Sequence, residues 1–407
     1  MKVLYISYDG MTDPLGQSQV IPYLEGLVKK GHTVTLISCE KPERAKDQSN
    51  IQQILAVAKI EWHPVQYTKK PPVISTIKDI RSIYKLAAHL VKENKIETVH
   101  CRSYIAALIG LRLKNNFNTK FIFDMRGFWA DERVEGGIWN LKNPVYKIIY
   151  SYFKKKEKLF LEKADYIVSL TENAKQEILS WKNISHQPLK IDVIPCCVDM
   201  NLFDTTKISV TAIQNKKSEL GLTDAAFVLS YVGSIGTWYL CDDMLQFFSR
   251  LLKQIPTAKF LFITPEEKEF VIAKARVQNI PIENLVILRA SRNEMPLLLK
   301  CCDASIFFIK PSFSKKASSP VKQGEIMSMG IPIICNSKIG DTDLIVRESN
   351  AGFILDELTN DAFDKVITQL EKLKELNPTE IRKGAERFYS LEKGIDAYDS
   401  VYKKLSA

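Results

Sequence analysis

Two charged residues, Lys322 and Glu325, lie three positions apart in a stretch whose neighbours predict how they are presented. Ser319 followed by Pro320 is typical of a helix start, with serine as the N-cap. Gly330 and Pro332 are typical of a helix end, and the apolar run 331–335 predicts a buried strand. We therefore expect a loop, a short helix over 320–329 and a strand of a parallel sheet.

A helix of this kind could hold a nucleotide. Its amino end presents unpaired N–H groups and a positive dipole, which together can bind phosphate. Lys322 adds a positive charge in the first turn, and Glu325 can accept hydrogen bonds from a ribose diol. The stretch predicts a nucleotide-diphosphate site. An ordinary capped helix with two solvated side chains is the alternative, and this stretch alone does not decide between them.

Composition limits the class of protein. A chain of 407 residues exceeds the usual size of one core, so we expect two domains. Its net charge of +10 favours an anionic partner. The eight cysteines form no CxxC pair, which predicts neither a zinc site nor a disulfide framework and favours a reduced setting. No signal-peptide pattern or membrane-spanning stretch occurs. We expect a cytoplasmic protein, attached at most peripherally to the inner face of the cell membrane.

The elements that would position these residues alternate between strand and helix twice along the chain. This pattern predicts two doubly wound parallel sheets of the α/β class, facing a central cleft. The expected domains span 1–200 and 201–389, and a last helix, 390–407, packs back on the first domain. Residues 200–225 are polar and aperiodic, which indicates a linker. Single helices are expected over 17–30 and 360–375.

Three residues of the first half are candidates for the functional edge of its sheet, because ligands of such sheets bind beyond the carboxyl ends of strands. Asp124 and Arg126 follow a predicted strand, and Gly16 follows the opening one. Gly16 would allow a phosphate or sugar to approach the backbone, or would simply make the turn. Arg126 would serve the site, or would pair with Asp131 in a salt bridge that shapes the loop. The absence of a GxGxxG motif argues against a nicotinamide or flavin cofactor.

Aromatic residues alternate with lysines over 142–163, and the loop 67–72 repeats this composition on a smaller scale. Such a helix suits peripheral contact with an anionic membrane. A helix with one core face and one solvated basic face is the alternative. Net charge alone also suggests a nucleic-acid binder, but no recognition motif supports that class, and we expect no nucleic acid as partner.

The order of several stretches resembles the retaining glycosyltransferases of family 4, which have the GT-B fold of two Rossmann-like domains. The matching stretches cover essentially the whole chain and are the Gly16 loop, Ala164–Val168, Ile194–Asp199, Tyr231–Gly233 and Ser319–Pro332. The resemblance implies a sugar-nucleotide donor on the second domain, an acceptor on the first, and no required metal or other cofactor. Its Glu-x7-Glu element has Glu325 as the second glutamate, but Ala317 stands at the first.

The resemblance also assigns roles to single residues. Gly233 and Ser234 follow the first strand of the second domain, where relatives hold the donor diphosphate with an Arg and a Lys that are absent here. Lys322 then supplies the charge on the diphosphate, with Arg126 reaching from the other domain. Ser318 or Ser319 replaces the missing sugar contact. Asp124 stands where the family has a histidine and would position or stabilise the reacting sugar.

The implied reaction transfers a hexose with retention from a nucleotide sugar, with UDP as the expected nucleotide. The acceptor would be a saccharide or a polyprenyl-linked saccharide, in the synthesis of a cell-surface polysaccharide or glycan. Two alternatives stay open: a sugar-nucleotide epimerase or hydrolase of the same fold, and an inert donor-binding subunit, which the alanine at 317 suggests.

Overall fold

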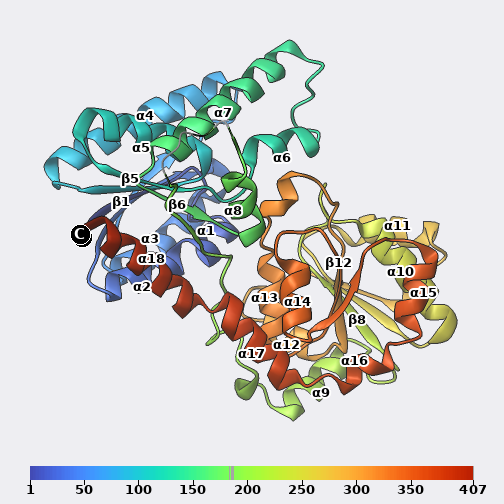
Figure 1. Cartoon of the computed structure of the whole chain (residues 1–407). Helices are drawn as coiled ribbons and strands as arrows, with labels where there is room; N and C mark the ends of the chain where they lie inside the picture. Colours follow the sequence, from blue (N-terminus) through green and yellow to red (C-terminus); the bar gives the residue numbers. More distant parts are fainter. Residues whose placement is uncertain (183, 185–187, 407) are drawn as a thin grey trace. The chain divides into compact units, whose positions relative to one another are not determined.

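The computed structural model describes residues 1–182, 184 and 188–406. It divides into two compact units, the first containing Met1–Pro195 with the C-terminal helix and the second containing Cys196–Ser390. Each unit is built around one parallel sheet with helices packed against it (Figure 1).

The sheet of the N-terminal unit has seven strands in the order β3-β2-β1-β4-β5-β6-β7, all paired in parallel. The strands are β1 (Lys2–Ser7), β2 (Thr33–Glu40), β3 (Glu61–Gln66), β4 (Thr98–Arg102), β5 (Lys120–Asp124), β6 (Tyr166–Ser169) and β7 (Ile191–Val193). The central strands are buried along nearly their whole length. The interiors of β1 and β5 are apolar, as burial on both faces requires, whereas β4 also buries Thr98, His100 and Arg102. The order changes direction between β1 and β4, and both strands therefore end at the edge where such sheets bind ligands.

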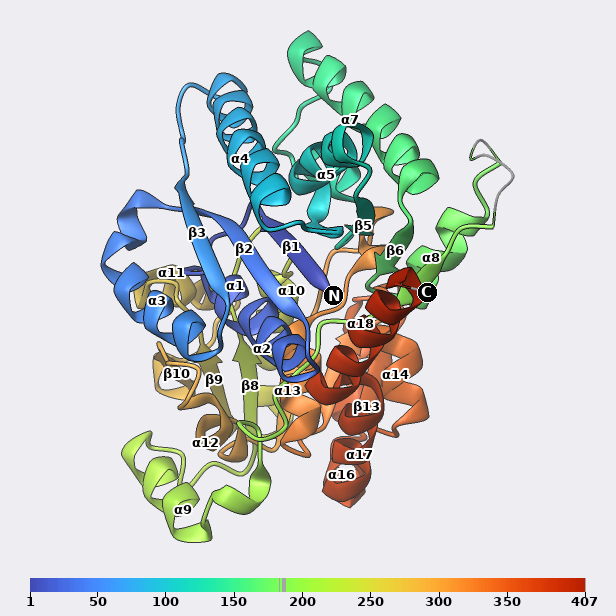
Figure 2. The same ribbon diagram turned by 90° about the vertical axis from the view of Figure 1, so that its left-hand side faces the viewer.

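Helices cover both faces of this sheet. Figure 2 shows α4, α5 and α7 on one face and α2 and α18 on the other. The helices are α1 (Pro14–Gln19), α2 (Ile21–Lys29), α3 (Gln48–Val57), α4 (Ile74–Glu93), α5 (Ser103–Phe117), α6 (Trp129–Glu135), α7 (Pro144–Lys163), α8 (Glu172–Leu179) and α18 (Leu391–Ser406), with the 3-10 turn η1 (Pro42–Asp47).

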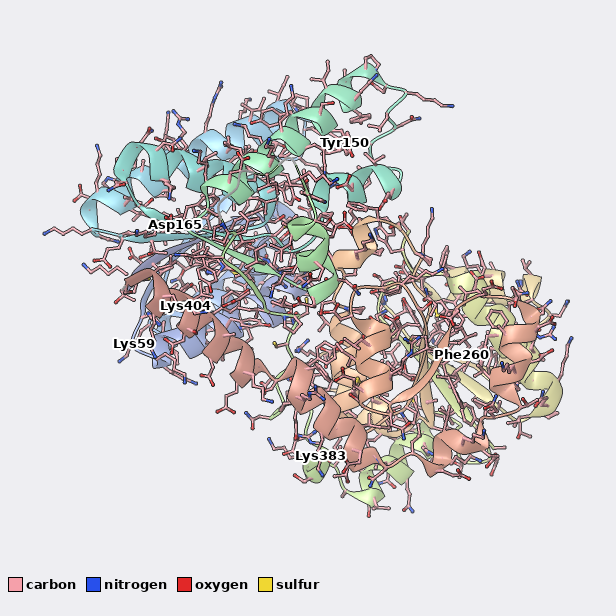
Figure 3. The ribbon with its side chains drawn as sticks, viewed as in Figure 1. Lys59, Tyr150, Asp165, Phe260, Lys383 and Lys404 are labelled. Atoms are coloured by element: carbon pink, nitrogen blue, oxygen red, sulfur yellow. The ribbon has the colours of Figure 1, made fainter. Side chains whose placement is uncertain are left out.

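The C-terminal helix α18 belongs to the N-terminal unit. Ile395 packs directly on Gly26 of α2, where any side chain larger than hydrogen would collide with it. Lys404 donates hydrogen bonds to Asp192 and to the Tyr166 hydroxyl at 3.0 and 2.8 Å (Figure 3). The helix is therefore fixed on this unit by packing along its length and by polar contacts near its end.

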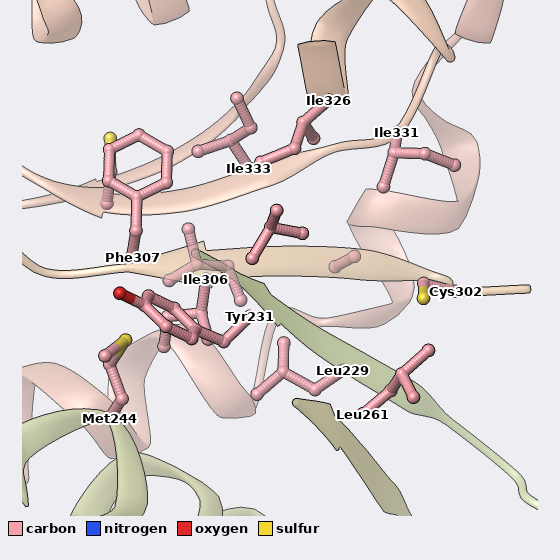
Figure 4. Close-up of a cluster of buried hydrophobic side chains, with 14 of the residues drawn as sticks. Leu229, Tyr231, Met244, Leu261, Cys302, Ile306, Phe307, Ile326, Ile331 and Ile333 are labelled. Carbon is pink, nitrogen blue, oxygen red and sulfur yellow. The ribbon is translucent and has the colours of Figure 1, made fainter. Parts of the chain in front are cut away.

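The C-terminal unit repeats the topology with six parallel strands in the order β10-β9-β8-β11-β12-β13. These are β8 (Val228–Val232), β9 (Lys259–Ile263), β10 (Leu285–Leu288), β11 (Ala304–Phe307), β12 (Ile333–Asn336) and β13 (Gly352–Leu355). Its helices are α9 (Val210–Glu219), α10 (Cys241–Gln254), α11 (Lys268–Val277), α12 (Met295–Lys300), α13 (Val321–Ser328), α14 (Thr342–Glu348), α15 (Asn360–Ile367), α16 (Glu371–Glu375) and α17 (Pro378–Tyr389), with 3-10 turns η2 (Thr205–Lys207), η3 (Ile282–Asn284) and η4 (Ser314–Ala317). Leu229, Tyr231 and Ile306 lie in the apolar core that this sheet and its helices enclose (Figure 4).

Two helices expected as continuous are interrupted. The expected helix 17–30 is divided at Val20 into α1 and α2. Pro22 explains the break, because proline has no N–H to donate to the preceding turn. The expected helix 360–375 is likewise divided into α15 and α16.

The expected linker over 200–225 is wrong. This segment lies inside the C-terminal unit and contains α9, whose first turn is capped by Ser209 accepting from the Ala212 N–H. Phe203 and Leu222 are buried in the core of the unit. The sequence of the segment is polar because α9 itself buries no residue fully.

No helix in the described part of the chain is both long enough and apolar enough to cross a membrane.

Candidate functional site

Helix α13 begins beyond the carboxyl end of β11, as expected, but its start is not capped by Ser319. Pro320 occupies the N-cap position and no side chain caps the helix. The Ser319 hydroxyl instead accepts a hydrogen bond from the Cys196 N–H at 3.1 Å. Ser318 directly follows η4, and its N–H bonds to the Lys315 carbonyl. The first turn of α13 therefore keeps its backbone donors without a side-chain cap.

Lys322 is the second residue of α13, and its side chain is buried among aromatic rings. Its Nζ lies 3.5 Å from the ring centre of Tyr239 and 4.3 Å from that of Tyr231. The Nζ also donates a hydrogen bond of 3.2 Å to the Tyr231 hydroxyl. Burial lowers the pKa of Lys322 well below its ordinary value, and Glu325 only partly opposes that shift. The amine of Lys322 is thus held in a desolvated site by ring faces and one neutral hydroxyl.

The glycine at 233 makes room for this lysine. Gly233 has a φ of +114°, and a Cβ there would lie 2.9 Å from the Lys322 Nζ. Ser234 contributes through its backbone, because its carbonyl accepts a 2.7 Å hydrogen bond from the Tyr231 hydroxyl. The loop after β8 therefore shapes the surroundings of Lys322 without contributing a charged side chain of its own.

A second lysine, Lys315 of η4, packs against the same loop. The Lys315 Nζ is 3.7 Å from the ring centre of Trp238, and Lys315 is buried although its side chain is charged. The loop is held to the chain after β11, where the Lys310 N–H bonds to the Trp238 carbonyl and Tyr239 forms a bridge with Ile309. Lysines and aromatic rings thus come together at the carboxyl edge of β8 and β11.

Glu325 lies one turn further along α13 and is paired with an arginine. Its Oε1 accepts a 2.8 Å hydrogen bond from the Nη1 of Arg292. Burial raises the pKa of Glu325, and Arg292 and Lys322 offset part of that rise. The guanidinium also lies 5.5 Å from the ring centre of Phe203. The carboxylate is nearly buried, since Glu325 is 8% exposed, and is oriented by one cation.

Ala317 lies in η4 and is buried. It provides no carboxylate at the first position of the Glu-x7-Glu element. Among the described residues, His, Cys, Asp and Glu side chains form no group of three or more that could hold a metal ion.

In the N-terminal unit, Asp124 is the last residue of β5 and is 1% exposed. Its Oδ2 accepts a 3.1 Å hydrogen bond from the Tyr398 hydroxyl and lies 3.5 Å from the His100 Nε2. Burial alone would raise the pKa of Asp124, but Arg126 and His100 lower it below its usual value. Burial lowers the pKa of His100, whose Nδ1 lies 2.8 Å from the Tyr402 hydroxyl. Asp124 is thus a buried carboxylate anchored by helix α18.

Arg126 lies two residues beyond β5 in a left-handed backbone conformation with φ of +57°. Its Nη1 is 3.7 Å from the Asp124 Oδ1. The Nε of Arg102, at the end of neighbouring β4, lies 3.4 Å from Asp9. The pairing of Arg126 with Asp131 that we considered is wrong. Asp131 instead accepts hydrogen bonds of 2.8 Å from both Lys154 and Tyr150.

Gly16 lies in α1 against the chain's own backbone. A Cβ there would be 2.3 Å from the Gly10 carbonyl oxygen and 2.6 Å from the Met11 Cα. The loop that approaches it is held by the buried Glu40 carboxylate, which accepts hydrogen bonds from the N–H groups of Met11 and Thr12. The close approach that requires glycine is therefore internal, and a contact of Gly16 with a ligand stays a prediction.

The structure thus brings together Lys322, Gly233 and Ser234 in one unit and Asp124 and Arg126 in the other. It adds groups that the sequence reasoning missed: Tyr231, Tyr239, Trp238, Lys315 and Arg292 around α13, and His100 and Tyr398 around Asp124. Tyr231–Gly233 is one of the stretches that carry the family resemblance, whereas Trp238 and Tyr239 belong to none of them. No spacing rule links them to Lys322, which is some ninety residues away.

Comparison with solved structures defines the fold. A glycosyltransferase from Rickettsia africae matches with a TM-score of 0.75 at 17% identity, over 99% of this chain and 98% of that one. A sucrose-phosphate synthase from Thermosynechococcus elongatus matches with a TM-score of 0.75 at 13% identity, over 100% and 99%. The Anabaena protein HepE, solved with UDP and glucose, matches with a TM-score of 0.71 at 11% identity, over the whole of both chains. The two units therefore form the GT-B fold.

Sequence profiles then identify the family. Residues 18–202 match Glycosyltransferase Family 4, and residues 212–387 match Glycosyl transferases group 1. A search of curated proteins found no match. The chain belongs to the family 4 glycosyltransferases, which transfer sugars.

Proposed function

We propose that this protein transfers a hexose, with retention, from a nucleotide-diphosphate sugar to a saccharide or polyprenyl-linked saccharide in the synthesis of a cell-surface polysaccharide or glycan. The observation that carries the donor site is Lys322. Its ammonium is buried near the uncapped amino end of α13, next to tyrosine rings rather than within salt-bridge distance of a described carboxylate. Such a group is costly to bury unless an anion joins it, and the diphosphate of a nucleotide is an anion of the right kind.

Glu325 supports the nucleotide assignment. Its carboxylate is held by Arg292 on the same helix as Lys322, one turn further from the amino end. In this proposal it accepts hydrogen bonds from the ribose diol while Lys322 and the helix end hold the phosphates. UDP is the expected nucleotide, and this expectation is supported by HepE, which was solved with UDP and with UDP-glucose. We propose no metal or other cofactor.

The proposed chemistry is the breaking of the bond between the anomeric carbon and a phosphate oxygen. That oxygen takes the electron pair, and Lys322 stabilises the charge it gains. The acceptor hydroxyl forms the new bond on the same face of the sugar, and its proton leaves with the departing diphosphate. Asp124, kept ionised by Arg126 and His100, would stabilise positive charge on the anomeric carbon or position the sugar.

The remaining predicted contacts have smaller roles in this proposal. Gly233 and Ser234 would line the diphosphate through the backbone beside Lys322. Ser318 and Ser319 lie just before α13, and one of them would replace the sugar contact that Ala317 cannot make. Gly16 would let a phosphate or sugar of the donor approach the backbone of its loop.

The test has two steps. Thermal unfolding is followed with UDP, GDP and their sugars, because a ligand that binds only the native state raises the midpoint. We expect a shift with UDP species that is lost in Glu325→Ala. Release of nucleoside diphosphate is then measured with and without candidate acceptors, and we expect Lys322→Ala and Glu325→Ala each to reduce it by about 10²-fold.

Each step has an outcome that overturns part of the proposal. Near-wild-type rates in both variants would reject the site. Nucleotide binding without any turnover would favour the inert donor-binding subunit. Turnover that does not depend on an acceptor would favour the epimerase or hydrolase.

A further inference from the structure

Two segments of the N-terminal unit expose large apolar side chains to solvent. The first comprises the start of α4 and the residue before it, where Val73, Ile74 and Ile77 are each more than 40% exposed. The second runs from the loop before α7 into its first three turns. Its exposed residues are Ile138, Leu141, Val145, Ile148 and Tyr152. Exposed apolar groups in clusters, unlike single ones, indicate a surface that meets another body.

The apolar residues of the second segment follow a helical repeat. Leu141, Val145, Ile148 and Tyr152 are separated by four, three and four residues, the spacing that aligns side chains on one face of a helix. Further along, α7 buries Phe153, Phe160 and Leu161 against its own unit. The helix therefore has two apolar faces, one inside the unit and one, near its start, exposed.

This exposure is not the result of a loosely held chain end. Asn143 caps α7 by accepting a hydrogen bond from the Val145 N–H at 2.9 Å, and Pro144 occupies the first turn. Trp139 is buried, with its ring 5.2 Å from that of Trp129. The backbone on either side of Leu141 is thus fixed, and the apolar side chains around it project from a defined surface.

The charge of both segments has a single sign. Residues 67–78 and 137–156 contain no Asp or Glu, whereas they contain Lys69, Lys70, Lys78, Lys142, Lys147, Lys154, Lys155 and Lys156. Lys154 must be set apart from the others. Its Nζ is paired with Asp131 and Glu157, and the Tyr104 hydroxyl also binds Glu157. Lys154 therefore does not take part in the membrane contact expected for 142–163, because the buried Glu157 draws its ammonium inward.

The topology places both segments at one edge of the unit. Helix α4 follows the carboxyl end of β3, helix α7 follows that of β5, and both helices pack against α5. In a parallel sheet these ends share one edge. Figures 1 and 2 show the two helices starting at the same end of the N-terminal unit. Asp124 and Arg126 lie at the same edge, after β5.

We propose that residues 69–78 with 138–152 form a docking face that inserts its apolar side chains into the interface of an anionic lipid bilayer, while the flanking lysines contact the headgroups. The absence of acidic residues is what selects a bilayer as the occupant, because an anionic surface attracts each lysine and requires no matched counter-charges. Long lysine side chains also let their charged ends stay in water beside a buried apolar group. The inference deepens the proposed function and rests on it in one respect. Docking would bring the sheet edge that carries Asp124 and Arg126 to a lipid-linked acceptor.

The test is flotation of the full chain with vesicles of phosphatidylcholine alone and with vesicles that also contain phosphatidylglycerol. We expect binding to the anionic vesicles, weakened by salt. Val145→Asn with Ile148→Asn should reduce the partition coefficient by about tenfold or more. Lys142→Gln with Lys147→Gln should reduce it by about fivefold for each lysine.

Matched controls use the same substitutions elsewhere. Val57→Asn and Val277→Asn remove apolar residues that are 85% and 77% exposed but lie outside the docking face. Lys95→Gln with Lys120→Gln removes two charges at the amino ends of β4 and β5, the opposite edge of the sheet. We expect all of these controls to bind vesicles as the unaltered chain does.

Three outcomes would overturn the proposal. The first is that the unaltered chain does not bind anionic vesicles. The second is that the face variants and the control variants lose vesicle binding equally. The third is that the chain binds no vesicles but self-associates, and that Val145→Asn with Ile148→Asn converts it to monomers. The thermal shift with UDP is measured on the same variants and should be unchanged. Failure of vesicle binding with an intact shift rejects the docking face alone, and loss of the shift in the unaltered chain rejects the donor site alone.

Discussion

The ammonium group of Lys322 lies 3.5 Å from the centre of the Tyr239 ring. The ring face attracts a cation, but it does not replace the water that a charged ammonium loses on burial. This is why the pKa of Lys322 is lowered even though two tyrosine rings surround it. Burial of the charged amine therefore costs free energy, and an anionic ligand beside it would offset that cost.

We therefore predict that UDP binding is coupled to proton uptake by Lys322. A diphosphate beside the ammonium raises its pKa, so UDP affinity should fall as pH rises above the pKa of the free protein. Calorimetric titrations at one pH in buffers of different ionisation enthalpy measure the protons taken up. Lys322→Met provides the control, because any uptake that persists in it comes from UDP itself or another group. Equal uptake in the two proteins would contradict the assignment.

The same lysine should lower the free energy of unfolding of the ligand-free protein. Its folded pKa lies below its unfolded value, so the unfolded state binds the proton more readily, and stability rises with pH between the folded pKa and about 10.5. Lys322→Met should consequently stabilise the free protein, by about 1.4 kcal/mol for each pKa unit of the shift. The gain should be largest below the folded pKa and shrink as pH approaches about 10.5. Urea unfolding across that range gives the answer, and a gain that is independent of pH would indicate better packing instead.

Gly233→Ala should disturb Lys322 directly. The added Cβ would lie 2.9 Å from the lysine Nζ, and the φ of +114° is unfavourable for alanine. We expect a loss of stability of about 1–3 kcal/mol from the backbone alone, with a further loss from the contact. In the double variant with Lys322→Ala, the second loss should disappear. Additive effects in the double-mutant cycle would mean that the two residues do not interact in solution.

Much of this site could be predicted from local patterns. Lys322 and Glu325 were found because a helix start, a helix end and a buried strand each have signals within a few residues. The same signals misplaced the cap, since Ser319 has the right type at the right position but its hydroxyl bonds to Cys196, more than a hundred residues earlier. A side chain with a distant partner cannot be recognised from its neighbours in sequence.

The environment that gives the site its chemistry was out of reach for the same reason. Lys322 is desolvated by Tyr231 and Tyr239, and Glu325 is oriented by Arg292, contacts that only the fold brings together. Composition did indicate the basic and aromatic character of 142–163. It could not indicate that Lys154 turns inward to Glu157 while Ile148 stays exposed, because both lie on one helix and only the packing of α7 separates them.

Our last prediction concerns the anchor of Asp124. Tyr398→Phe removes the hydroxyl that donates to this buried carboxylate, which should raise the pKa of Asp124 and destabilise the protein by about 1–3 kcal/mol at neutral pH. The sign with pH follows from the lowered pKa of Asp124. The carboxylate contributes stability above its unfolded pKa and loses that contribution as pH falls through the folded value. The deficit of the variant should therefore shrink in acid.

Tyr402→Phe is the matched control on the same helix as Tyr398. It removes a hydrogen bond to His100 but keeps the Tyr398 hydroxyl that donates to Asp124, so it should cost about 1 kcal/mol while leaving the contribution of Asp124 in place. Urea unfolding at neutral and acidic pH compares the two, and matching pH profiles would show that Tyr398 only fills space beside Asp124.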